Sequence, residues 1–185
     1  MKDTVHLLSG GLDSVAMLHE NRDRIALCLL LDYKQRHKQE LQFAIVHAKR
    51  VGIPFLTLEL PQLGGLNEQS WIVPNRNAIF ISVAANVASQ TGNSVVTIGC
   101  NRDDADYFPD CRPAFIEASN AMLAAAGYSI TVEAPYLKKT KAEIMQIAKR
   151  FGILPDEIWT CYQPTETGKC GKCSACTKLE KVCGQ

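Results

Sequence analysis

Short apolar runs alternate with longer amphipathic segments along most of this chain, and this alternation is the feature that most restricts its fold. The run from Ile25 to Leu31 is apolar at every position, which is typical of a strand covered on both faces of a sheet. The residues from His37 to Val51 have helical periodicity, with an apolar face formed by Leu41, Ala44, Ile45 and Ala48. This strand–helix order predicts an α/β fold with a doubly wound, open parallel sheet.

The other elements follow the same alternation. Further strands are expected over Val5–Leu8, Pro54–Leu60, Val95–Gly99 and Ser129–Ala134. Further helices are expected over Asp13–Asn21, Asn77–Thr91, Pro113–Ala126 and from Thr140, where Thr140 and Glu143 have capping-box spacing, to about Phe151. Irregular, polar segments are expected over residues 62–75 and 101–111. We expect one α/β domain over residues 1–158 and a small cysteine-rich subdomain over residues 159–185.

Composition sets limits on the kind of protein. The chain has 185 residues, of which 46% are hydrophobic and 21% are charged, as in an ordinary globular protein. The net charge is +1, which gives no support to nucleic-acid or membrane binding by bulk electrostatics, although a local basic patch stays open. The sequence has no apolar run long enough to cross a bilayer and no recognisable signal peptide, so we expect a cytoplasmic protein.

A glycine-rich turn lies between the first expected strand and helix, and it comprises Ser9, Gly10, Gly11, Leu12, Asp13 and Ser14. Glycines allow backbone N–H groups to approach a phosphate, and the following helix N-terminus favours negative charge. Ser9 and Ser14 offer hydroxyls, and Asp13 is a candidate ligand of Mg²⁺ bridging phosphates. Asp13 stands where a Walker A loop has lysine, so this is not that motif. The alternative is a plain strand–helix turn with an Asp-Ser cap.

Four cysteines near the C-terminus have the spacing of a metal site, and they are Cys161, Cys170, Cys173 and Cys176. Four thiolates are a common closed, structural ligand set for tetrahedral Zn²⁺. An iron–sulfur cluster is the alternative, since C-x-x-C-x-x-C also occurs in ferredoxins. That pattern normally continues with Cys-Pro, which is absent here, so zinc is favoured. Unligated thiols are the remaining reading.

The turn SGGLDS resembles the pyrophosphate loop of the ATP-pyrophosphatase superfamily. With four further segments, the chain resembles the 7-cyano-7-deazaguanine synthase family along almost its whole length. These segments are DYKQRH (32–37), VPNRN (73–77), DYFPDCR (106–112) and TCY with CGKCSAC (160–162 and 170–176). The resemblance implies an adenine nucleotide alpha hydrolase-like, Rossmann-like fold with a zinc-binding subdomain, and ATP, Mg²⁺ and Zn²⁺ as cofactors. Two departures from the family are Lys34, where a small residue is usual, and a short segment over residues 61–75.

Site residues follow from these segments. Asp13, Ser14, Arg36, Arg76 and Lys141 are the candidates for catalysis, by charge neutralisation and positioning. The candidates for binding the acid substrate are Arg76, Asn77, Gly99, Asp106, Tyr107 and Asp110. Asp106 and Asp110 would accept hydrogen bonds from a guanine-like base, and Tyr107 or Phe108 would stack on it. Plainer readings also exist: Arg36 as a solvated charge, Asp110 as a helix cap and Lys141 as a surface lysine.

The resemblance implies a ligase that forms C–N bonds. The substrates would be 7-carboxy-7-deazaguanine, ATP and ammonia, and the acid would pass through an acyl-adenylate and an amide to the nitrile. Alternatives are a relative that stops at the amide or uses another carboxylate, a tRNA-thiolating enzyme, and a zinc-ribbon binding module with a vestigial nucleotide site. No nucleic-acid or membrane partner is expected, and a homodimer is a possible assembly.

Overall fold

The fold is an α/β structure built on one parallel sheet. The computed structural model describes residues 2–35, 38–63, 73–166 and 168–184. The sheet has five strands in the order β3-β2-β1-β4-β5, and every pairing is parallel. The strands are β1 (Thr4–Leu7), β2 (Ile25–Asp32), β3 (Phe55–Glu59), β4 (Val95–Thr97) and β5 (Thr131–Glu133). The predicted doubly wound parallel sheet is therefore confirmed.

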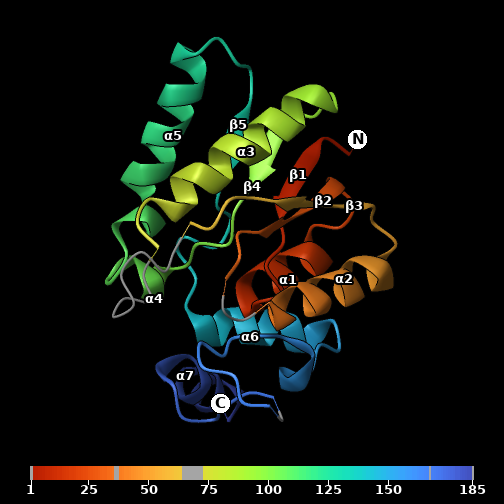
Figure 1. The fold of residues 1–185 in the computed structure, drawn as a ribbon, viewed down its shortest axis with the longest axis vertical. Helices are drawn as coiled ribbons and strands as arrows, with labels where there is room; N and C mark the ends of the chain where they lie inside the picture. The colour runs from red at the N-terminus through yellow and green to blue at the C-terminus, as the bar shows by residue number, and fades with distance from the viewer. Residues whose placement is uncertain (1, 36–37, 64–72, 167, 185) are drawn as a thin grey trace.

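Helices cover both faces of this sheet (Figure 1). The helices that connect or follow the strands are α1 (Leu12–Glu20), α2 (Gln39–Val51), α3 (Arg76–Gln90), α5 (Pro113–Ala125) and α6 (Lys141–Arg150). One core cluster joins residues of α1, α2 and α6 on one face. A second joins residues of α3 and α5 on the other. The central strand β1 is buried along its whole length, and its buried His6 is hydrogen-bonded to the Thr97 hydroxyl and the Ser14 carbonyl.

The switch in strand order falls at β1. The chain leaves β1 toward β2 on one side, while β4 pairs with β1 on the other. In an open parallel sheet, ligands bind beyond the carboxyl ends of the strands at such a point. The segments that follow β1 and β4 are residues 8–11 and 98–101, so these are the loops that frame the site.

Two regions differ from the expectation. The segment expected as a polar loop over residues 101–111 contains the short helix α4 (Arg102–Ala105) and a 3-10 helix over Pro109–Cys111. Asn101 caps α4 by accepting a hydrogen bond from the backbone N–H of Asp104. The cysteine-rich tail contains helix α7 (Ser174–Cys183), which packs beside α6 at the C-terminal end of the molecule (Figure 1).

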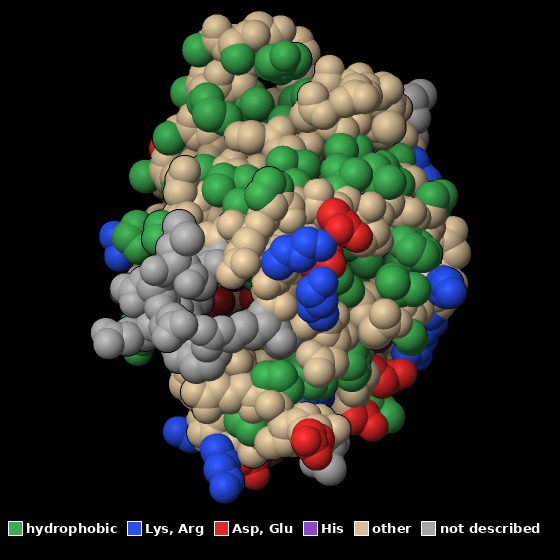
Figure 2. Space-filling model, in the orientation of Figure 1, with side chains coloured by type: hydrophobic (Ala, Val, Ile, Leu, Met, Phe, Trp, Pro, Cys, Tyr) green, Lys and Arg blue, Asp and Glu red, His purple; other side chains and the backbone are tan. Residues whose placement is uncertain are grey.

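Charged side chains of both signs lie together on the face shown in Figure 2, beside a band of hydrophobic side chains. Two ion pairs lie at the ends of β2 and β3: Lys34 pairs with Glu59 at 2.7 Å, and Lys38 pairs with Asp32 at 3.0 Å. Neither lysine therefore contributes an isolated positive charge. Within the described residues, none of the helices is both long and apolar enough to pass through a membrane.

Candidate active site and metal centre

The turn from Ser9 to Ser14 connects β1 to α1 and is closed by its own hydroxyl groups. The Ser9 and Ser14 hydroxyls lie 3.0 Å apart, and the backbone N–H of Ser9 donates to the Ser14 hydroxyl at 3.2 Å. The Ser14 hydroxyl in turn lies 3.1 Å from the Gly11 carbonyl, to which it donates. Gly11 is the N-cap of α1, and within the described residues no side chain caps this helix end by a hydrogen bond. The helix N-terminus is thus available to an anion.

Two glycines allow the backbone to approach this turn closely. Gly10 has a φ of +82°, and a Cβ added there would collide with the backbone carbonyl of Glu40. A Cβ on Gly99 would lie 3.3 Å from both the Cβ of Asp13 and the backbone nitrogen of Ser14. Gly10 is therefore required by the shape of the turn, while Gly99 lets the loop after β4 pack closely against α1.

Asp13, in the first turn of α1, belongs to a polar network that reaches α4 and α6. Asn101 donates from one Nδ2 to Asp13 Oδ2 at 2.7 Å and to Asp104 Oδ2 at 2.8 Å. Asp104 Oδ1 forms an ion pair with Lys141 Nζ at 3.0 Å. The backbone N–H of Lys141 donates to Asp103 at 2.9 Å. Residues from three separate segments are thereby held around the start of α1.

The environment of Asp13 raises its pKa to about 6, chiefly because burial disfavours the carboxylate. Lys141 opposes this shift, and the hydrogen bond from Asn101 does so to a smaller extent. The Asp13 Oδ1 atom is buried and has no hydrogen-bond partner among the residues that the structure describes. A buried carboxylate oxygen with no partner among the described residues, beside the glycine-rich turn, fits a ligand of Mg²⁺, which prefers hard oxygen ligands.

A cavity of about 640 Å³ opens above these residues. Most of the predicted site residues line it: Ser9, Gly11, Leu12, Asp13, Ser14, Arg76, Asn77, Gly99, Tyr107 and Lys141. The cavity therefore brings together residues far apart in the sequence. The Cζ atom of Arg76 lies 5.7 Å from the centroid of the Phe80 ring, so this ring helps to orient the guanidinium.

Three predicted site residues lie outside the lining, and one cannot be placed. Gly10 belongs to the turn but lies against the backbone of Glu40 and does not line the cavity. Asp106 follows α4 and is exposed, and the Asp110 carbonyl accepts a hydrogen bond from Asn77 Nδ2 at 3.4 Å. Arg36 falls outside the described residues. The base-binding role predicted for Asp106 and Asp110 stays a prediction.

The sequence reading missed three polar residues of this site. Asp104 and Glu40 line the cavity, and Asn101 is buried completely beneath Asp13. Burial raises the pKa of Glu40 to about 7, and a hydrogen bond from Gln35 opposes the shift. The one sequence signal available was the position of Asn101 and Asp104 directly after an expected strand, in the loop that also carries Asp106.

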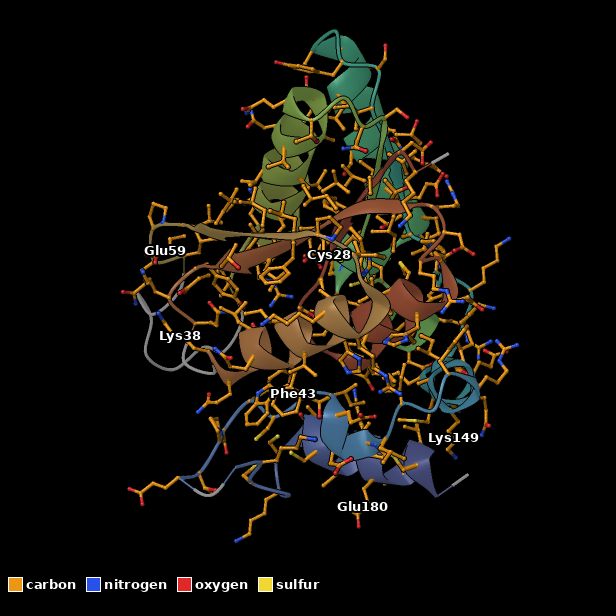
Figure 3. All side chains as sticks on the ribbon, turned by 90° about the vertical axis from the view of Figure 1, so that its right-hand side faces the viewer. Cys28, Lys38, Phe43, Glu59, Lys149 and Glu180 are labelled. Carbon is orange, nitrogen blue, oxygen red and sulfur yellow. The ribbon has the colours of Figure 1, made fainter. Side chains whose placement is uncertain are left out.

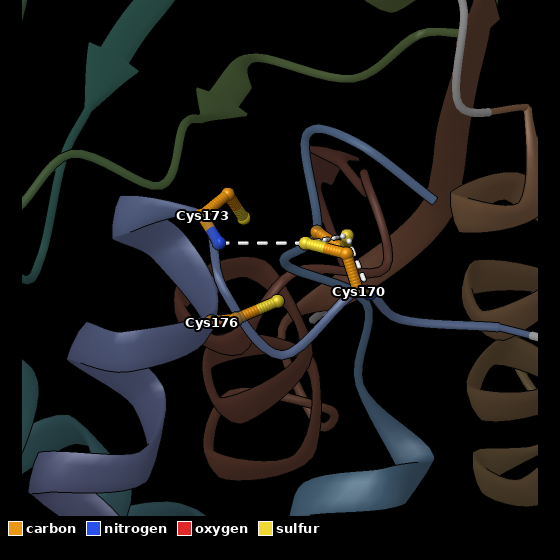
Figure 4. A group of neighbouring side chains, drawn as sticks. Cys170, Cys173 and Cys176 are labelled. Atoms are coloured by element: carbon orange, nitrogen blue, oxygen red, sulfur yellow. Dashed lines mark hydrogen bonds between the residues drawn. The ribbon is translucent and has the colours of Figure 1, made fainter. Parts of the chain in front are cut away.

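The four tail cysteines form a single cluster. The Sγ atoms of Cys161, Cys170, Cys173 and Cys176 all lie within 4.8 Å of one another. Thiolates about 2.3 Å from one tetrahedral ion lie about 3.8 Å apart, so the cluster could bind one zinc ion. The backbone N–H groups of Lys172 and Cys173 each donate to Cys170 Sγ at 3.4 Å, and Figure 4 shows the bond from Cys173. These two bonds lower the pKa of the Cys170 thiol to about 6. They thus favour the ligating thiolate.

The cysteine cluster is joined to the glycine-rich turn by a short connection. The backbone N–H of Trp159 donates to the Gly10 carbonyl at 2.8 Å, and its indole N–H donates to the Cys161 carbonyl at 3.1 Å. Phe43 projects from α2 toward the tail, with its ring centroid 5.4 Å from that of Trp159 (Figure 3). Tail residues including Tyr162 and Lys178 also line the cavity. The four-cysteine cluster therefore holds one wall of the candidate active site.

Solved structures of low sequence identity share the fold. An NMN synthetase from Francisella tularensis matches with a TM-score of 0.62 at 14% identity, covering all of this chain and 78% of that one. An NH3-dependent NAD synthetase from Campylobacter jejuni matches with a TM-score of 0.59 at 19% identity, over 84% of this chain and 66% of that one. The U34-tRNA thiolase NcsA from Methanococcus maripaludis matches with a TM-score of 0.58 at 17% identity, over 98% of this chain and 64% of that one.

Curated relatives are much closer in sequence. A 7-cyano-7-deazaguanine synthase from Agrobacterium fabrum is 36% identical over 97% of this chain and 86% of its own length. A 7-cyano-7-deazaguanine synthase from Porphyromonas gingivalis is 34% identical over 98% of this chain and 92% of its own length. The first alignment spans 204 positions, more than the 185 residues of this chain, so the relative carries additional residues. The family model for queuosine biosynthesis protein QueC matches residues 3–72 and 67–182. The predicted family is thus confirmed, and the chain belongs to the QueC family of queuosine biosynthesis proteins.

Proposed function

We propose that this protein converts 7-carboxy-7-deazaguanine, ATP and ammonia to 7-cyano-7-deazaguanine, AMP and pyrophosphate. The observation that carries the proposal is the meeting of the Ser9–Ser14 turn, the uncapped start of α1 and Lys141 in one cavity, in a chain whose relatives are named for this product. The turn and helix end suit a pyrophosphate, and the cavity leaves space for a second, planar ligand.

In this proposal the phosphates of ATP lie against the turn. Backbone N–H groups at the start of α1 and the ammonium of Lys141 neutralise charge on the leaving pyrophosphate. Mg²⁺ would be held by Asp13, and it would supply further charge neutralisation between phosphate oxygens. Lys141 is paired with Asp104 in this structure, and it would keep this partner while its other N–H groups donate to the phosphates.

The acid would occupy the part of the cavity near α3. Arg76 carries the positive charge that suits a carboxylate, and Asn77 presents a buried amide at the first turn of α3. Tyr107 offers a ring for stacking. Asp106, Asp110 and Arg36 remain the predicted partners of the base and phosphates, as derived from the sequence.

The chemistry requires positioning more than a covalent nucleophile. A carboxylate oxygen attacks the α-phosphate, and pyrophosphate leaves. Ammonia then attacks the acyl carbon, AMP leaves, and the nitrogen loses a proton as the amide forms. Glu40 lines the cavity with a pKa of about 7, so we assign it the acceptance of that proton. A second ATP adenylates the amide oxygen, and a second pyrophosphate leaves. Loss of AMP and of both N–H protons of the amide then leaves the nitrile.

The four-cysteine cluster is proposed to hold one structural Zn²⁺. The short separations of the four Sγ atoms suit a single ion better than a larger polynuclear cluster. With four thiolates the site is closed, so the metal would order the tail wall of the cavity and would take no direct part in the reaction.

The test is an assay of AMP and pyrophosphate release. We expect release to require the deazaguanine acid as well as ATP and Mg²⁺, and to accelerate when ammonium is added. Benzoate and guanine serve as control compounds, because one supplies only the carboxylate and the other only the base. Release of AMP at the same rate without the acid, or with any simple carboxylate, would contradict the proposed substrate.

A further inference from the structure

Asn101 is buried completely at the end of the loop after β4, and all of its side-chain polar atoms are used. Its Nδ2 donates one hydrogen bond to Asp13 at 2.7 Å and one to Asp104 at 2.8 Å. Its Oδ1 accepts from the backbone N–H of Asp104 at 3.0 Å. One amide thus connects α1 to α4 at the floor of the cavity.

This arrangement brings two carboxyl groups against a single neutral donor. Without a donor between them, two nearby carboxylates repel each other and one of them holds a proton. The amide occupies Oδ2 of each aspartate, which leaves Oδ1 of each for other partners. Asp104 Oδ1 binds Lys141, while Asp13 Oδ1 has no partner among the described residues and lies beside the phosphate-binding turn.

We propose that Asn101 is a positioning residue that fixes Asp13 for the cation of Mg·ATP and, through Asp104, fixes Lys141 for the phosphates. The inference rests on the proposed function in that it takes Mg·ATP as the ligand of the turn. It adds a residue that contacts neither ATP nor the acid. Asn101 acts through the orientation of the groups that do.

A purely structural role for Asn101 makes a different prediction. As the cap of α4, Asn101 needs only an acceptor oxygen, and serine and aspartate supply one almost as well. Neither of them supplies two N–H donors. Asn101→Ser and Asn101→Asp therefore keep the cap and remove the proposed positioning, and aspartate also adds a third carboxylate to the cluster.

The first measurement is the affinity for Mg·ATP by titration calorimetry, with ATP and Mg²⁺ alone and no acid. Charge-assisted hydrogen bonds of this kind contribute enough that we expect both variants to bind at least about 10-fold more weakly, and to lose about 100-fold in kcat/KM for ATP. The KM for the acid should change less than about threefold. Asn120→Ser is the matched control, because Asn120 makes two hydrogen bonds to the backbone of Val132 far from the turn. It should destabilise the fold and leave Mg·ATP affinity unchanged.

The second measurement is the pH dependence of Mg·ATP binding. The groups that face Asp13 are Lys141 of α6, Asp103 and Asp104 of α4, and more distantly Cys100 and Tyr136. The Asn101 donor favours the ionised form of Asp13, so Asn101→Ser should move the acid limb of binding to higher pH. A variant that only loosened the helix would leave the limb in place.

The outcomes separate this inference from the proposed function. If Asn101→Ser and Asn101→Asp, shown to be folded by circular dichroism, bind Mg·ATP as the wild type does, Asn101 is only a helix cap and the inference is wrong. If the wild type binds Mg·ATP but never turns over the acid, the proposed substrate fails, and the variants still decide the role of Asn101. If the wild type does not bind Mg·ATP, the inference fails together with its premise.

Discussion

At the scale of single residues, position 10 accepts only glycine without distortion of the turn. Its φ is +82°, and a Cβ there would collide with the Glu40 carbonyl. We expect Gly10→Ala to lower the free energy of unfolding by more than about 2 kcal/mol, because left-handed strain and overpacking add. It should also abolish AMP formation, since the turn cannot keep its shape. Urea denaturation and the AMP assay provide the measurements.

Gly92 provides the control for this substitution. It has a similar φ of +69°, but a Cβ there would meet no atom of the described residues within 4 Å. Gly92→Ala should therefore show only the left-handed strain of about 1–2 kcal/mol and keep its activity. Equal losses of stability in the two variants would mean that the contact with Glu40 is unimportant.

The buried carboxyl group of Asp13 is expected to lower the free energy of unfolding, although the proposed reaction needs it. Burial raises its pKa to about 6 from an ordinary value of 3.8, so between these values the folded state holds a proton that the unfolded state has lost. Stability therefore falls as pH rises through this window, and the penalty is complete above pH 6. Asp13→Asn should remove it, raising the free energy of unfolding at pH 8 by about 3 kcal/mol while eliminating AMP formation.

The diagnostic result is the pH dependence of the difference between the two proteins. Urea denaturation of wild type and Asp13→Asn at several pH values should show the stability gain growing from pH 4 to pH 6 and then levelling. A gain that is the same at every pH would assign the effect to packing and not to the carboxyl group.

The site residues that the sequence could indicate are those whose chemistry depends on neighbours in the chain. Asp13 and Ser14 follow two glycines between a strand and a helix, so their role is readable locally. Asn101 and Asp104 have no such pattern, because their role arises only when the loop after β4 returns to α1. In the same loop the sequence favoured Asp106, which the structure leaves exposed.

At the scale of elements, the capping box of α6 stabilises the helix turn that carries Lys141 of the candidate site. Thr140 accepts a hydrogen bond from the backbone of Glu143, and Glu143 accepts one from the backbone of Thr140. The next residue is Lys141. We expect Thr140→Ala to cost about 1 kcal/mol of stability and to lower kcat/KM for ATP, because the first turn that carries Lys141 frays. Urea denaturation and steady-state kinetics measure the two effects.

Thr140→Ser keeps the capping hydroxyl and is the control for this variant. It should match the wild type in both measurements to within a few tenths of a kcal/mol and about twofold in rate. If Thr140→Ala loses stability and keeps its full rate, the cap does not help to position Lys141.

Elements with strong periodicity were predictable to within two or three residues. The run from Ile25 to Leu31 became β2, and the capping box at Thr140 was confirmed. The short helix α4 was not predicted, since four residues are too few to show a helical period. Helix α7 was missed because its segment is dominated by the cysteine pattern, and its place beside α6 depends on tertiary contacts.

At the scale of the whole molecule, the tail and the α/β part share one cavity, so metal loss should affect both. We expect elemental analysis to find about one zinc per chain. Chelation, or Cys170→Ser, should unfold the tail and weaken binding of the acid and ATP, because Tyr162 and Lys178 leave the cavity wall. Circular dichroism and titration calorimetry would follow the two changes.

Cys183 supplies the control thiol. It lies in α7 outside the four-cysteine cluster, so Cys183→Ser should keep the metal and the binding of both substrates. Stoichiometric iron with visible absorption would assign the site to an iron–sulfur cluster. Unchanged substrate binding after complete metal removal would contradict the role of the tail as a cavity wall.

The central claim is that this chain carries a deazaguanine acid through to the nitrile. The most direct measurement is mass spectrometry of the product made by the wild type from 7-carboxy-7-deazaguanine, Mg·ATP and ¹⁵N-labelled ammonium. We expect 7-cyano-7-deazaguanine with the label in its nitrile nitrogen. AMP should accumulate at about two molecules per nitrile, because the acid and the amide are each adenylated once. Accumulation of labelled amide without nitrile, or unchanged acid despite consumption of ATP, would contradict the claim.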